Sequence, residues 1–161
     1  MAEDGAGDRY GGNAGREAAV GWATRAAARL GFSALTAALA ASYLDGCFLL
    51  GGAGNAGRLQ LGGQPWMARL AAVACVALAA KVEETRVPEL LDLQLLAAES
   101  PGDAFVFDPK TVRRMEGLVL NALAWRMHPV TPFSFLQPVL ADEPARLQRC
   151  DGVLLAVMAG V

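Results

Sequence analysis

The chain has 161 residues, of which 54% are hydrophobic and 19% are charged, and its formal net charge is -2. This composition suffices for one domain with a buried core, and the scarcity of β-branched runs favours an all-α fold. The slightly acidic balance excludes the usual nucleic-acid binder, which gathers basic side chains on one face to neutralise phosphates.

The residues also argue against a metal centre, a cofactor or a catalytic site. The three cysteines, Cys47, Cys75 and Cys150, have neither metal-binding nor redox spacing. The glycines of residues 51–63 lack the Lys-Ser/Thr ending of a phosphate-binding loop. The acidic N-terminus carries no signal-peptide pattern. We therefore expect a protein that is not an enzyme and has no cofactor.

In chain order, residues 1–14 are glycine-rich and polar, and we expect a disordered N-terminal arm there. Apolar residues at helical spacing then predict a first helix over residues 16–30, which Gly31 would end. Ser33 is a suitable N-cap for a second helix that reaches about residue 50.

The third predicted helix is the most distinctive. Pro65 stands at a permitted first-turn position, and residues 70–80 carry no polar side chain. A helix that is apolar all round lies in a membrane or at the centre of a bundle, and a membrane span takes roughly 20 residues. This run is too short, so we expect no membrane span and a central helix whose charged end emerges at Lys81.

The fourth and fifth predicted helices follow. Residues 88–98 carry the leucines of the fourth helix, and Asp108 with Pro109 marks the start of a fifth that reaches about Trp125. Glu116 stands out there as a carboxylate on a helix that we expect to be mostly buried. Beyond it, an extended connector over 128–132 and helices over 133–140 and 144–158 are expected.

Several segments together resemble the box of plant D-type cyclins: Gly31–Thr36, Gln64–Thr85, Val87–Gln94, Arg114–Glu116 and Leu123–Pro132. The resemblance covers about residues 15–140, and the order and spacing of the segments make it specific. It implies a five-helix cyclin box around the central third helix at 15–128, followed by an incomplete C-terminal cyclin fold at 129–161.

The resemblance implies a regulatory subunit that binds and activates a cyclin-dependent Ser/Thr kinase in the cell cycle, at G1/S, in the nucleus and cytoplasm. The two kinase-contacting residues of the family correspond to Lys81 and Glu116. An alternative is a divergent or truncated cyclin-fold protein that binds a kinase without activating it. From the residues alone, Lys81 could equally be a charge at a helix C-terminus, and Glu116 an i,i+3 partner of Arg113.

The resemblance assigns two further sets of residues. Arg16 and Asp45 match a buried structural ion pair, and Trp22 with Val20 matches a shallow groove that docks substrate motifs. Trp22 could equally be plain core packing. Gly21 stands where an acidic residue is usual in the family. A retinoblastoma-related protein is a further partner that the resemblance suggests, although the Leu-x-Cys-x-Glu motif is absent from this sequence.

Overall fold

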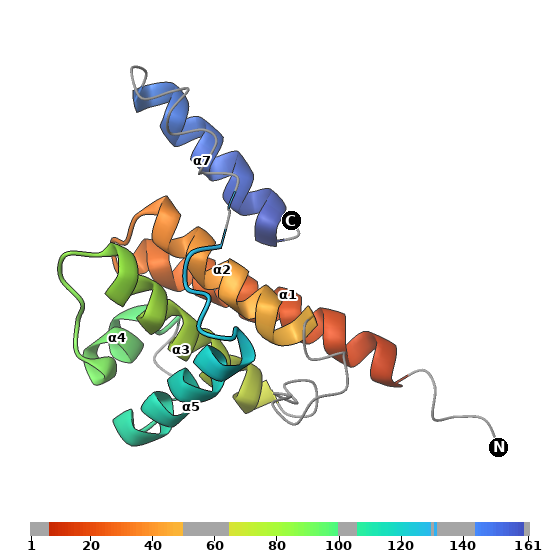
Figure 1. Cartoon of the computed structure of the whole chain (residues 1–161). Coiled ribbons are helices and arrows are strands. Elements are labelled where there is room, and N and C mark those ends of the chain that lie inside the picture. Colours follow the sequence, from red (N-terminus) through yellow and green to blue (C-terminus); the bar gives the residue numbers. More distant parts are fainter. Residues whose placement is uncertain (1–6, 50–64, 100–105, 130, 132–143, 160–161) are drawn as a thin grey trace.

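The computed structural model describes residues 7–49, 65–99, 106–129, 131 and 144–159. Throughout this part the regular structure is helical, as the sequence predicts (Figure 1). The helices are α1 (Gly7–Arg29), α2 (Ala34–Leu49), α3 (Pro65–Glu83), α4 (Leu90–Ala97), α5 (Pro109–Ala122) and α7 (Pro144–Ala159).

Helix α3 is the centre of the bundle. Every residue from Leu70 to Ala80 is buried, and none of them is more than 6% exposed. Helices α1, α2, α4 and α5 all pack against α3. The many alanines of α3 favour the helix and let the neighbouring backbones approach closely. The prediction of a central third helix that is surrounded by the other helices is therefore confirmed.

Helix α1 differs from the prediction at its N-terminus. The helix begins at Gly7 rather than at Arg16, so residues 7–14 of the expected disordered arm are helical. Glycine lowers helix propensity, but extending a helix that already exists gains one hydrogen bond for each residue fixed. The packed part of α1 supplies such a helix.

The predicted stop of the first helix is present in detail. Gly31 has a positive φ of 71°. The N–H of Phe32 donates to the carbonyl of Ala27 at 2.9 Å, and the N–H of Gly31 donates to that of Ala28 at 3.2 Å. These two bonds form a Schellman motif, which needs a left-handed residue and so favours glycine.

Two predicted N-caps are also present. The Ser33 hydroxyl oxygen accepts the backbone N–H of Thr36 at 3.2 Å and caps α2. The Asp108 carboxylate accepts the N–H of Lys110 at 3.1 Å, with Pro109 as the first residue of α5. Local side-chain chemistry therefore starts both helices.

The fourth and fifth helices are shorter than predicted. Helix α4 begins at Leu90, because Glu89 before it is extended, with a ψ of 150°. Helix α5 ends at Ala122, because Ala124 and Trp125 have positive φ values of 51° and 59°. Trp125 is consequently 66% exposed instead of continuing an apolar helix face.

The helix predicted near the C-terminus is present as α7, which packs against α2 and α1 (Figure 1). An Arg16 Nη2 group donates to the carbonyl of Met158 at 3.4 Å and links α7 to α1. The predicted loop at 51–63 and the predicted helix at 133–140 lie outside the described residues.

Candidate functional site

The structure brings together two residues that the sequence singled out separately. Lys81 lies in the last turn of α3 and Glu116 lies in α5. The Lys81 Nζ atom is 2.9 Å from Glu116 Oε1 and 3.0 Å from Oε2. Glu116 is thus the partner of a lysine on another helix, rather than only a neighbour of Arg113 on its own.

This pair combines a buried and an exposed member. The Glu116 side chain is 9% exposed, whereas that of Lys81 is 49% exposed. A lysine has three N–H donors, and each carboxylate oxygen has two acceptor positions. The pair therefore retains both donor and acceptor capacity for further hydrogen bonds at the edge of the α3–α5 contact.

A second acidic residue, Glu84, directly follows α3 and anchors its C-terminal end. Its Oε1 atom accepts the backbone N–H of Ser33 at 2.8 Å and the hydroxyl of Thr36 at 2.7 Å. These bonds, the one to the Ser33 backbone first, lower the pKa of Glu84. Glu84 therefore joins the C-terminal end of α3 to the capped start of α2.

Sequence reasoning missed Glu84. In a capping box the glutamate stands three residues after the cap, where this chain has Thr36. Here Glu84 supplies the carboxylate from a distant part of the chain. Glu83 and Glu84 after Lys81 indicate an acidic helix end. Only the tertiary structure shows what Glu84 contacts.

Arg16 and Asp45, matched to a structural ion pair, lie in contact. Arg16 Nε is 2.6 Å from Asp45 Oδ1, which joins α1 to α2. Their side chains are 20% and 30% exposed, so the pair is less buried than expected. Removing one partner should therefore cost less than the ~3–5 kcal/mol of a fully buried pair.

Trp22 and Val20 are core residues in this structure. Trp22 is 4% exposed and Val20 is 0% exposed, so Val20 presents no surface to a docked peptide. The guanidinium carbon of Arg69 lies 4.6 Å from the centroid of the Trp22 ring. The Trp22 Nε1 atom is buried and has no hydrogen-bond partner among the residues described. The docking role of this region stays a prediction.

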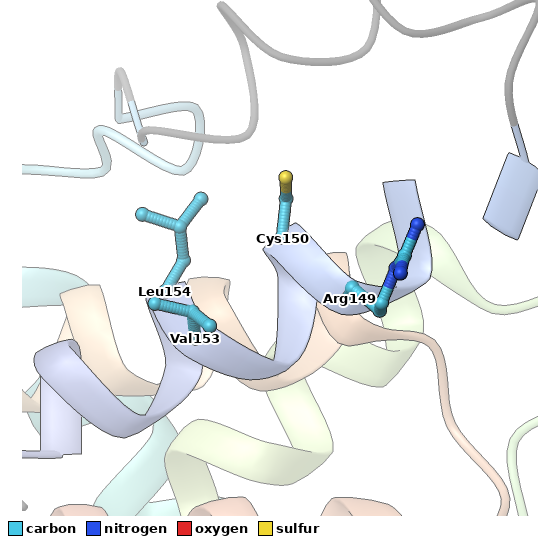
Figure 2. A pocket seen from close by; sticks show the side chains of 4 residues that line it. All are labelled: Arg149, Cys150, Val153 and Leu154. Atoms are coloured by element: carbon cyan, nitrogen blue, oxygen red, sulfur yellow. The ribbon is translucent and has the colours of Figure 1, made fainter. Parts of the chain in front are cut away.

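The structure also holds a pocket of about 340 Å³ along α7. Arg149, Cys150, Val153 and Leu154 line it, and all four belong to α7 (Figure 2). One thiol and one guanidinium among aliphatic side chains form no acid–base pair, and we assign this pocket no catalytic role.

The described ranges contain neither a metal-binding cluster nor a membrane-spanning helix. No cluster of three or more His, Cys, Asp or Glu side chains in them could hold a metal ion. None of their helices combines the length and apolarity needed to cross a membrane.

Comparison with known proteins identifies the class of this fold. The family described as cyclin, N-terminal domain, matches residues 11–128. Cyclin-D3-2 of rice (Oryza sativa subsp. japonica) is 71% identical over 154 residues, which are 94% of this chain and 41% of that protein. Cyclin-D3-3 of Arabidopsis thaliana is 41% identical over 150 residues, which are 89% of this chain and 38% of that protein. No solved structure matches.

The fold is a helical bundle around a buried central helix, and the cyclin domain matches most of the chain. These two findings define the chain as a cyclin. Cyclins are regulatory proteins and are not themselves enzymes. The chain belongs to the cyclin family, and within it to the plant D-type cyclins. It spans about two fifths of the length of the curated relatives named above: 41% of the rice protein and 38% of the Arabidopsis protein.

Proposed function

We propose that this chain binds and activates a cyclin-dependent Ser/Thr kinase in control of the G1/S transition, in the nucleus and cytoplasm. The observation that carries the proposal is the Lys81–Glu116 pair at the surface where α3 meets α5. Both residues correspond to kinase-contacting positions of the family that the chain resembles.

The chemistry of the pair suits this role. A kinase is active only when its strand lysine and its mobile-helix glutamate are paired. A partner that holds the mobile helix inward shifts the kinase toward that state, provided that it binds that state more tightly. Lys81 would donate to backbone carbonyls of the helix, and Glu116 would accept from its backbone N–H groups. Both bonds would be charge-assisted and therefore stronger than neutral ones.

The surroundings of the pair support an interface. Val82 follows Lys81, and Leu120 lies one helical turn after Glu116; both are partly buried and pack against the core. Apolar surface beside a charged pair helps to exclude water from the hydrogen bonds that the pair makes. In the free chain the two side chains hold each other in place, which limits the ordering that binding must impose.

Two further partners belong to this proposal. The region of Trp22 would dock substrate motifs, as the resemblance to the family implies. A retinoblastoma-related protein is one substrate class for such a complex. Because the Leu-x-Cys-x-Glu motif is absent, it would need a different surface, such as this docking region.

The decisive experiment is a pull-down of the purified chain with a plant cyclin-dependent kinase, with kinase activity read on the same beads. The test variant combines Lys81→Glu with Glu116→Lys, which exchanges the two charges and so allows the ion pair to form in reverse. We expect this variant to unfold at nearly the same temperature but to lose kinase binding. Arg149→Glu on α7 is the control for a charge change far from the pair.

The outcomes separate the candidate functions. Binding and activity that both depend on the pair support an activating cyclin. Binding without activity supports the alternative, a cyclin-fold protein that binds a kinase without activating it. A folded chain that does not bind, or a charge-exchanged variant that binds as well as the original chain, overturns the proposal.

A further inference from the structure

Two of the three cysteines lie buried against each other in the core. Cys47 of α2 is 2% exposed, and Cys75 of α3 is 0% exposed. Both belong to the same hydrophobic cluster, and a hydrogen bond joins their side chains. The two thiols therefore face each other where α2 packs against α3. Their spacing in the sequence does not indicate this contact, because only the packing of the two helices creates it.

Small side chains surround this thiol pair. Ala71 and Ala79 lie one turn before and one turn after Cys75 on α3, and both are fully buried. Ala40, two turns before Cys47 on α2, is also fully buried. The distance between two packed helices depends on the side chains at their contact, and alanines keep it short. A disulfide needs Cα atoms about 4–7 Å apart, so a contact of this kind suits one.

The two thiols differ in how an oxidant can reach them. Burial raises the pKa of Cys75, and the hydrogen bond with Cys47 raises it further, so Cys75 stays protonated and reacts slowly. Cys75 also lies in the middle of α3. Cys47 instead lies in the last turn of α2, which ends at Leu49. Because helix ends fray, Cys47 is the thiol that becomes transiently exposed.

We propose that Cys47 and Cys75 form a redox pair, which a hydroperoxide oxidises to a disulfide that fastens α2 to α3. Cys47 is the thiol that is oxidised first, and Cys75 is the thiol that resolves the product. The third cysteine, Cys150, is partly exposed on α7 and takes no part. The reaction involves no kinase, and so it can be tested apart from the proposed function.

The oxidation takes two steps, shown here for hydrogen peroxide. The Cys47 thiolate attacks one peroxide oxygen, so that an S–O bond forms, the O–O bond breaks and the departing hydroxide takes up a proton to give water. The sulfur of Cys75 then attacks the sulfenic sulfur of Cys47. The S–S bond forms, the S–O bond breaks, and hydroxide leaves as water with the proton of Cys75. The two sulfurs together lose two electrons, which the peroxide accepts.

The disulfide would stabilise the folded chain. It closes a loop over residues 47–75, which restricts the unfolded chain more than the folded chain. We expect the oxidised chain to unfold at a temperature about 5–10 °C higher than the reduced chain. Because α3 also carries Lys81, oxidation fastens the helix that presents one member of the Lys81–Glu116 pair.

The test uses the whole chain with Cys150→Ser, because this change removes the thiol that could link two copies. Hydrogen peroxide is added, the chain is unfolded, the remaining thiols are alkylated, and the mass is measured before and after proteolysis. We expect both remaining thiols to resist alkylation, the mass to fall by two hydrogen atoms, and one linked peptide to contain Cys47 and Cys75. Dithiothreitol should restore both thiols and the lower unfolding temperature.

Two single variants of the Cys150→Ser chain test the order of the steps. With Cys75→Ala the first product cannot be resolved, so Cys47 should accumulate as a sulfenic acid that dimedone traps. With Cys47→Ala the buried Cys75 thiol has no partner and should stay reduced at the same peroxide concentration. In the original chain, oxidation of the partly exposed Cys150 is the control for active peroxide.

Three results would overturn the proposal. One is a Cys150→Ser chain that keeps both thiols under conditions in which the original chain is oxidised at Cys150. Another is a trapped sulfenic acid on Cys75 rather than on Cys47, which would reverse the assigned order. The third is a disulfide that lowers the unfolding temperature, which would mean that the bond distorts the core instead of fastening the two helices.

Discussion

The Nζ atom of Lys81 lies within 3.0 Å of both carboxylate oxygens of Glu116, although the two residues are 35 positions apart. The contact joins the end of the central helix α3 to α5. It fixes the position of each side chain relative to the other, and so it fixes the spacing of one donor and one acceptor at the surface. The same contact has a role in stability that can be measured apart from any kinase.

Lys81→Met should destabilise the chain. It leaves the nearly buried Glu116 carboxylate without its lysine, and we expect the free energy of unfolding to fall by about 1–2 kcal/mol. The loss is moderated because Lys81 is half exposed. Urea unfolding followed by circular dichroism measures it. Adding Glu116→Gln should recover part of the loss, and no recovery would mean that Lys81 acts through packing alone.

The Arg16–Asp45 ion pair should contribute modestly. With side chains 20% and 30% exposed, a double-mutant cycle with alanine at both positions should give a coupling energy of about 1 kcal/mol. The coupling should weaken at high salt because exposed charges are screened. A coupling energy near zero would show that α1 and α2 are held together by their apolar faces alone.

Glu84→Ala should cost more than the same change at its neighbour Glu83. Glu84 accepts the Ser33 N–H and the Thr36 hydroxyl, and losing these bonds should lower the free energy of unfolding by about 1–2 kcal/mol. Glu83 is exposed, so Glu83→Ala is the matched control and should change stability by less than about 0.5 kcal/mol. Equal losses would contradict the anchoring role of Glu84.

Glu84 should also make the chain sensitive to acid. Its pKa is lowered in the folded state, so the folded chain binds fewer protons than the unfolded chain as the pH falls below the ordinary value of 4.5. Its contribution is complete above that value and is lost as the pH falls through the lowered folded pKa. Glu84→Gln should therefore flatten the decline of stability below about pH 4.5, measured by thermal unfolding across pH.

The raised pKa of Tyr43 predicts a loss of stability at alkaline pH. Burial first, then the charges of Cys75 and Glu83, raises the pKa of Tyr43 from 10.0 to about 12. The stability that depends on its protonated form is complete below pH 10 and is lost as the pH rises through about 12. The Tyr43 hydroxyl also donates to the carbonyl of Met127 at 2.6 Å. An ultraviolet titration compared with Tyr43→Phe should show this late transition, and its absence would mean that Tyr43 is solvated.

Much of the fold follows from local sequence. The Schellman stop at Gly31, the caps at Ser33 and Asp108, and the apolar run of α3 each arise from residues close in the chain. Backbone preference, side-chain capping and apolar periodicity act over a few residues, so they can be read without the tertiary structure.

The tertiary structure alone decided the rest. Glu84 accepts a hydrogen bond from Thr36 at the start of α2, 48 positions away in the chain. Lys81 pairs with Glu116, which is 35 positions away. The ion pairs of Arg25 and Arg29 with Glu99 likewise join α1 to the residue that lies just beyond α4. Such contacts depend on how whole helices pack against α3. Packing sums many weak interactions between distant residues, and no local pattern encodes the outcome.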